Sequence, residues 1–123
     1  YRLDYLCYLW HTVGKMITTK NNVIMVDMDG VIHRAPSGSV FGDIKGEPIE
    51  GSQRTIKSLI AHGYEVYVFT ARTPDNWKNV REWLAKNGFP KLKVTNKKIA
   101  ARAYIDDRAI RFISWHDVAH YFL

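Results

Sequence analysis

The chain has 123 residues, of which 46% are hydrophobic and 13% aromatic, so it is long and apolar enough for one folded domain and is not intrinsically disordered. Its longest apolar runs are far too short to cross a bilayer, so we expect no membrane association. The net charge of +6 favours phosphate-bearing or polyanionic partners, although a simple role in solubility explains it equally well. A single cysteine excludes an intramolecular disulfide framework and fits a reducing compartment, so we expect a cytoplasmic protein.

Residues 1–21 are set apart from the rest of the sequence. Leu3, Leu6 and Val13 recur at helical spacing and predict an N-terminal extension that forms a short amphipathic helix. The segment lacks the basic start and the small-residue cleavage site of a signal peptide. Cys7 lies within it, and no local signature of a catalytic cysteine surrounds it. The folded domain is therefore predicted to cover residues 22–123.

The apolar run 23–26 ends in two carboxylates, Asp27 and Asp29, followed at once by Gly30. A short continuous apolar run is typical of a buried strand in a parallel sheet, and such sheets bind ligands beyond the carboxyl ends of their strands. Two carboxylates at that place repel each other unless a divalent cation is bound there. The alternative interpretation is a strand followed by an ordinary Asp-Gly turn.

Downstream of this strand, predicted helices alternate with predicted strands. The expected elements are a turn-rich loop or hairpin over 31–48, a helix over 49–62, a strand over 64–70, a helix from Thr73 to Asn87-Gly88, strands over 92–94 and 103–105, and a last helix capped by Ser114. This alternation predicts an α/β fold with a mostly parallel central sheet.

Both central helices carry an apolar face that should pack onto the sheet. Ile56, Leu59 and Ile60 share one face of the first helix. Trp77 and Trp83 recur at helical spacing in the second, so we expect them to pack against the domain core rather than to stack on nucleic-acid bases.

Three of the predicted strands end in polar side chains. The first ends at Asp27 and Asp29, the second at Thr70, and the last at Asp106 and Asp107. Parallel strands bring these ends to one edge of the sheet. A carboxylate nucleophile, a second carboxylate for proton transfer, a hydroxyl and hard oxygen ligands for Mg²⁺ are the groups that metal-assisted phosphoryl transfer requires.

These segments, in this order, resemble the four motifs of the haloacid dehalogenase-like (HAD) phosphohydrolases. The first motif is matched by 27–31, the second by 68–72, and the fourth by 104–107. Lys98 or Lys97 matches the third, and a shift of one residue in the strand exchanges which of the two points inward. The resemblance implies a three-layer α/β/α Rossmann-like domain, and the chain leaves no room for a cap domain.

The resemblance also implies roles for individual residues. The implied catalytic set is Asp27 as nucleophile, Asp29 as general acid and base, Thr70 as phosphoryl-binding group and Lys98 as neutralising cation. The implied Mg²⁺ ligands are Asp27, the backbone carbonyl of Asp29, Asp106 and Asp107. Gly30, Ala71 and Arg72 are candidate substrate-binding residues, while Arg72 and Arg108 could instead pair with a nearby aspartate.

The predicted function is that of a Mg²⁺-dependent phosphatase acting through an aspartyl phosphate. A site without a cap stays open, which suits nucleotides or nucleic-acid ends as substrates. One alternative is a non-catalytic HAD-like module that binds nucleic acid or a protein partner through its basic surface. A receiver-type phosphoacceptor fits less well, because its acceptor aspartate ends a middle strand, where this chain has Thr70.

Overall fold

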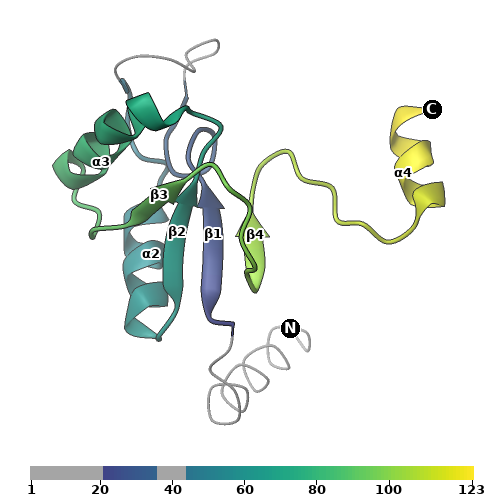
Figure 1. Cartoon of the computed structure of the whole chain (residues 1–123), viewed down its shortest axis with the longest axis horizontal. Coiled ribbons are helices and arrows are strands. Elements are labelled where there is room, and N and C mark those ends of the chain that lie inside the picture. The colour runs from purple at the N-terminus through teal and green to yellow at the C-terminus, as the bar shows by residue number, and fades with distance from the viewer. Residues whose placement is uncertain (1–20, 36–43) are drawn as a thin grey trace.

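The structure, a computed structural model, describes residues 21–35 and 44–123 (Figure 1). The predicted N-terminal helix with Cys7, and the middle of the predicted loop over 31–48, lie outside the described residues. The elements follow in the order β1 (Val23–Asp27), α2 (Ser52–Ala61), β2 (Glu65–Phe69), the 3₁₀ turn η1 (Pro74–Asn76), α3 (Trp77–Lys86), β3 (Lys93–Thr95), β4 (Ala103–Ile105) and α4 (Trp115–Phe122).

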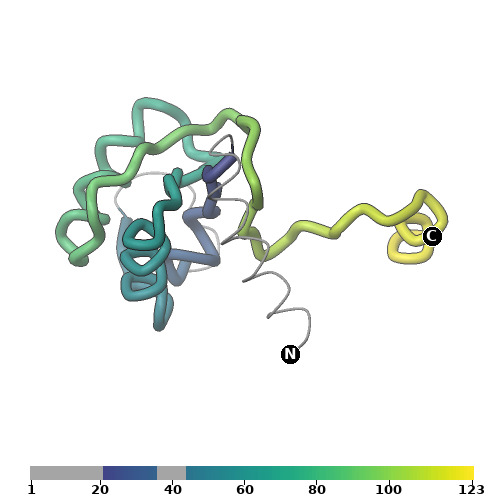
Figure 2. The backbone as a smooth tube through the Cα atoms, turned by 90° about the horizontal axis from the view of Figure 1, so that it is seen from below, coloured from purple at the N-terminus to yellow at the C-terminus, as the bar shows by residue number. Residues whose placement is uncertain are grey.

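The four described strands form one sheet in the order β3-β2-β1-β4, and every neighbouring pair is parallel. The chain therefore passes from one edge of the sheet to the other between β3 and β4 (Figure 2). In the pairing register Asp27 lies opposite Phe69, and Val26 lies opposite Ile105. The residues that follow β1, β2 and β4 thus emerge level with one another at a single edge. The predicted α/β fold with a parallel sheet is confirmed.

The core lies between the sheet and the two central helices. Ile24 and Val26 of β1 share one face with Val66 and Val68 of β2 because strand side chains alternate between faces. The buried side chains of α2 and α3 belong to the same apolar cluster, namely Ile56, Val80, Trp83 and Leu84. Within residues 21–35 and 44–123, the helices that pack on the sheet therefore cover this one face.

The helix boundaries differ from the prediction at their N-terminal ends. α2 begins at Ser52 rather than at residue 49, after Gly51 in the left-handed conformation. Pro74 opens the 3₁₀ turn η1, and α3 starts only at Trp77. Trp83 is buried in the core, as predicted, whereas Ile60 is 38% exposed and lies outside the apolar cluster.

The C-terminal helix α4 begins where the sequence predicts. The hydroxyl of Ser114 accepts a hydrogen bond from the backbone N–H of Asp117 at 3.2 Å and so caps the first turn. An extended segment carries α4 away from the sheet (Figures 1 and 2). Trp115 and Phe122 are exposed there, and no residue of α4 is buried. No helix in the described part of the chain is long and apolar enough to span a membrane.

Two isoleucines on α2 test the assignment of the core. Ile56 is 4% exposed and Ile60 is 38% exposed. Ile56→Ala should lower the free energy of unfolding by about 2–4 kcal/mol, because it removes buried methylene groups and leaves a cavity. Ile60→Ala, the same change on the same helix, should cost less than about 1 kcal/mol. Urea unfolding of both variants measures the difference, and equal losses would contradict the described packing.

Candidate functional site

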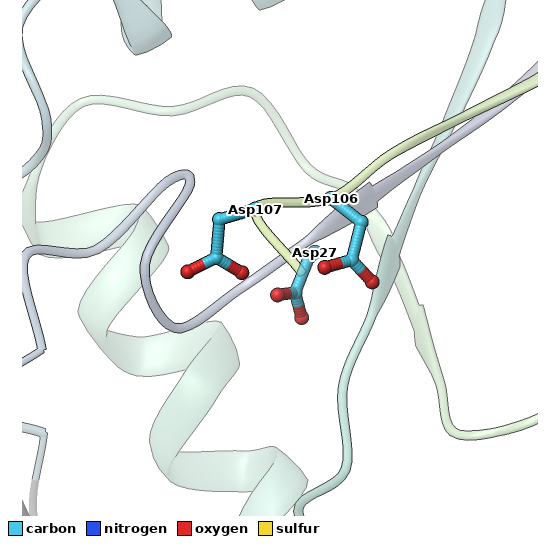
Figure 3. Close-up of side chains that lie close together, drawn as sticks. All are labelled: Asp27, Asp106 and Asp107. Atoms are coloured by element: carbon cyan, nitrogen blue, oxygen red, sulfur yellow. The ribbon is translucent and has the colours of Figure 1, made fainter. Parts of the chain in front are cut away.

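Three carboxylates gather at the edge where β1 and β4 end. Asp27 is the last residue of β1, and Asp106 and Asp107 directly follow β4. One oxygen from each carboxylate lies within 4.8 Å of the others (Figure 3). We call Asp27, Asp106 and Asp107 the acidic triad. It brings together three of the four residues expected to bind Mg²⁺.

The acidic triad is electrostatically unfavourable without a cation. Partial burial, followed by the nearby charges of Asp106 and Asp107, raises the pKa of Asp27 from its ordinary 3.8 to about 7. A divalent cation would reverse this effect, because it favours ionised carboxylates. Three oxygen donors from carboxylates are the ligand type that Mg²⁺ prefers. The donor set therefore fits the metal that the sequence predicts.

Gly30 allows Asp107 to approach the end of β1. Its φ is +96°, and a Cβ atom at this position would lie 2.5 Å from Oδ2 of Asp107. Any other residue would therefore displace the carboxylate as well as strain the backbone. The N–H of Gly30 donates to the carbonyl of His33 at 2.8 Å. Gly30, expected to contact substrate, thus has its amide occupied within the turn and leaves the space that Asp107 fills.

Asp29 is held by a separate, partly buried network. Arg72 donates from Nε to Oδ2 of Asp29 at 2.9 Å and from Nη2 to Oδ1 at 3.0 Å. Nδ1 of His33 lies 3.0 Å from Oδ1 of Asp29, and Nη1 of Arg72 donates to Asn76 Oδ1 at 2.8 Å. Arg72 is only 1% exposed. Of the two roles considered for Arg72, the structure shows pairing with a nearby aspartate.

This network sets the protonation of Asp29. Burial alone would raise its pKa, but the hydrogen bonds and charges of Arg72 and His33 outweigh that effect and lower the pKa. Asp29 is therefore ionised at neutral pH. In this state it can accept a proton, but it carries none to donate, so the arrangement suits a general base better than a general acid.

The remaining expected residues differ in how deeply they are buried. Thr70 is buried, and its hydroxyl accepts a hydrogen bond from the N–H of Arg72 at 3.1 Å. Ala71 is exposed beside it. The N–H of Arg108 donates to Oδ1 of Asp106 at 2.9 Å. Thr70 and Arg108 thus contribute to the local structure of the two strand ends.

The two candidate lysines have different surroundings. Lys98 lines the same cleft as Asp27, and its ammonium lies 4.8 Å from the centre of the Tyr104 ring. Lys97 is exposed, and its backbone N–H donates to the hydroxyl of Thr95 at 3.1 Å. The placement favours Lys98 as the lysine near the site, although no ion pair joins it to Asp27 within the described residues.

The sequence analysis missed His33 and Asn76. His33 is buried, contacts Asp29, and packs edge-on against Trp83 with ring centres 5.1 Å apart. A signal was present in the spacing, since His33 follows Asp29 by four residues and Asn76 follows Arg72 by four. The link between these two pairs, from Arg72 to Asp29, became recognisable only once the segments after β1 and β2 were placed side by side.

No family model matches the sequence, and comparisons with curated proteins and with solved structures give no significant match.

The Arg72–Asp29 pair predicts a large effect on stability. Arg72→Gln should lower the free energy of unfolding by about 3 kcal/mol, because it leaves the partly buried carboxylate of Asp29 without its counter-charge. The control is Lys78→Gln, which removes the exposed Lys78–Glu82 pair, 3.8 Å apart, and should cost less than about 0.5 kcal/mol. Similar losses in both variants, measured by urea unfolding, would contradict the described network.

The acidic triad predicts that the metal-free protein becomes less stable as the pH rises. The pKa of Asp27 is about 7 in the folded state against 3.8 ordinarily, so the folded state binds more protons than the unfolded chain between these values. The free energy of unfolding should therefore fall from about pH 4 to about pH 7 and level off above.

Urea unfolding in EDTA, with Asp27→Asn beside wild type, isolates this contribution. In the variant, the free energy of unfolding should fall less steeply with rising pH, because the amide that replaces the carboxylate does not titrate. Asp75→Asn, a change at an exposed aspartate on η1, serves as the control and should keep the wild-type slope. An unchanged slope in Asp27→Asn would show that Asp27 titrates normally.

Proposed function

We propose that the protein is a Mg²⁺-dependent phosphatase that hydrolyses phosphomonoesters through an aspartyl phosphate on Asp27. The observation that carries this proposal is the acidic triad, in which three carboxylates from two parallel strands converge at the edge where such sheets bind ligands. Close like charges at this edge are costly, and a bound cation accounts for them.

Mg²⁺ would be held by Asp27, Asp106 and Asp107, and when bound it would reduce the negative charge on the phosphoryl oxygens. The nucleophile is an oxygen of Asp27. It attacks the phosphorus, the bond from phosphorus to the ester oxygen breaks, and the leaving group departs with the electron pair. Water then attacks the phosphorus of the acyl phosphate, which releases phosphate and restores the carboxylate.

Asp29 takes the proton from the attacking water in the second step. Its ion pair with Arg72 keeps it ionised, as this role requires, and the lowered pKa makes it a weak base. The same ion pair leaves the first step without a ready proton donor, so esters with acidic leaving groups should react fastest. Thr70 and Lys98 are proposed to contact the phosphoryl oxygens.

Further properties belong to the same proposal. The domain would be HAD-like, without a cap, and its three-layer Rossmann-like form would require a second helix layer on the face of Met25 and Tyr67. An open site suits a phosphate on a larger molecule, and the positive net charge of +6 favours nucleotides or nucleic-acid ends. The proposed location is the cytoplasm.

Two observations favour a second candidate function, a non-catalytic module that binds a partner through its basic surface. Asp29 is fully engaged by Arg72 and His33, and Lys98 lies over Tyr104 rather than on Asp27. Such a module would bind anions without turning over a phosphate ester.

Hydrolysis of p-nitrophenyl phosphate distinguishes the two candidates. Wild type should release phosphate with Mg²⁺ and lose this activity in EDTA. Asp27→Asn should reduce kcat by at least about 1,000-fold, because the amide is a far weaker nucleophile than the carboxylate. Asp75→Asn should retain wild-type activity. Wild-type turnover in Asp27→Asn would contradict the assigned nucleophile, and anion binding without turnover in wild type would favour the binding module.

A further inference from the structure

One face of the sheet carries no helix layer in the described part of the chain. Met25 of β1 lies between Tyr67 of β2 and Tyr104 of β4 in the pairing register, and Phe69 follows on the same face. We call Met25, Tyr67, Phe69 and Tyr104 the open face. Met25 is buried but lies outside the apolar cluster under α2 and α3, while Tyr104 is 40% exposed. A cleft of about 800 Å³, lined in part by Met25, Phe69 and Tyr104, lies over it and gives room for bulky side chains.

The helix α4 carries a matching apolar surface. Four of its residues, at spacings of three and four, form one stripe that we call the α4 stripe: Trp115, Val118, Ala119 and Phe122. None of them is buried, and Trp115 and Phe122 are largely exposed. The helix has only 8 residues, fewer than the roughly 12–15 at which isolated helices become stable in water. A short helix with an exposed apolar stripe needs a surface to pack against.

The path of the chain favours a surface outside its own sheet. Residues 109–111 still line the cleft, and the chain then leaves it and carries α4 away from the sheet (Figures 1 and 2). Ser114, which caps α4, has extended backbone angles (φ −157°, ψ 159°). To return α4 to its own open face, the chain would have to reverse direction between Phe112 and Ser114. The α4 stripe needs no such reversal to reach a second copy.

We propose that α4 packs its stripe on the open face of a second copy of this chain, which returns its own α4 in the same way. Each copy offers both surfaces, so a two-fold axis satisfies both contacts at once. The exchanged helix supplies a second layer for the sheet and lies next to the acidic triad. The inference does not depend on the proposed phosphatase function, because the exchange involves no substrate.

The exchanged surface is large enough for a stable dimer. A buried aromatic side chain removes about 150–250 Å² of its own surface from solvent. Trp115 and Phe122 of both copies, with the sheet surface that they cover, would bury on the order of 1,600 Å², which is the size of a standard protein interface.

Sedimentation equilibrium of the full chain tests the exchange with two neighbouring aromatic residues. Wild type should sediment at micromolar concentration as a dimer with twice the chain mass of 14.3 kDa. Phe122→Ala should raise the dimer Kd about 100-fold, because each lost contact costs about tenfold and occurs twice in a two-fold dimer. Tyr121→Ala is the matched control, since Tyr121 is 68% exposed against 70% for Phe122 but lies outside the stripe. It should change the dimer Kd by less than about threefold.

The sheet side of the contact needs a variant of its own, because a dimer that depends on Phe122 could instead pair two α4 helices with each other. Tyr104→Ala should raise the dimer Kd by at least about tenfold. Ile60→Ala, at a side chain of similar exposure on the helix that covers the opposite face, should leave the Kd unchanged. Circular dichroism checks that both variants are folded.

Paramagnetic labelling detects the contact between copies without relying on the Tyr104 variant. A nitroxide at His120→Cys, in a Cys7→Ser chain, is mixed with a second chain that carries ¹³C-methyl methionine. The label should broaden the Met25 methyl signal of the second chain, whereas a nitroxide at Arg54→Cys, at an exposed residue of α2, should broaden it far less. A chain that stays monomeric, a dimer Kd that Phe122→Ala or a folded Tyr104→Ala leaves unchanged, or an unbroadened Met25 signal in the mixture overturns the exchange.

Discussion

The repulsion among Asp27, Asp106 and Asp107 is the physical constraint on which this account depends. Three carboxylates whose oxygens lie within 4.8 Å of one another oppose folding unless protons or a cation compensate them. The parallel register of β1 and β4 produces this cluster, because it brings Asp27 level with the start of the segment after Ile105. Gly30 completes it by leaving space for Asp107. The fold thus places the triad where a cation would offset its cost.

The second carboxylate of the Asp27–Asp29 pair has the opposite environment. Asp29 is ion-paired with Arg72 and hydrogen-bonded to His33, which come from the chain after β2 and from the turn after β1. Asp27 thus lies among like charges, whereas Asp29 is already paired and ionised. Their pKa values move in opposite directions, up for Asp27 and down for Asp29. These directions describe the protein without a cation, and a bound cation would hold Asp27 ionised as well.

The sequence predicted the strands and their polar ends well, because continuous apolar runs and the residues that end them are local signals. It placed Asp27, Asp106 and Asp107 at one edge of the sheet, where the structure also has them. The sequence could not decide whether Arg72 pairs with an aspartate or contacts substrate, because that depends on how close the segments after β1 and β2 lie. His33 was missed although it follows Asp29 by only four residues. The N-terminal ends of α2 and α3 were misplaced because a left-handed Gly51 and the 3₁₀ turn opened by Pro74 delay the start of each helix.

Direct binding of a divalent cation tests the central claim most directly. Mn²⁺, a spectroscopic substitute for Mg²⁺, is titrated into wild type, Asp106→Asn and Asp75→Asn, and free Mn²⁺ is followed by electron paramagnetic resonance. The account predicts one site in wild type and in Asp75→Asn, competed by Mg²⁺, with binding at least about tenfold weaker in Asp106→Asn. Absence of a site in wild type, or a site that Asp106→Asn leaves unchanged, would contradict the assignment of the acidic triad as a metal centre.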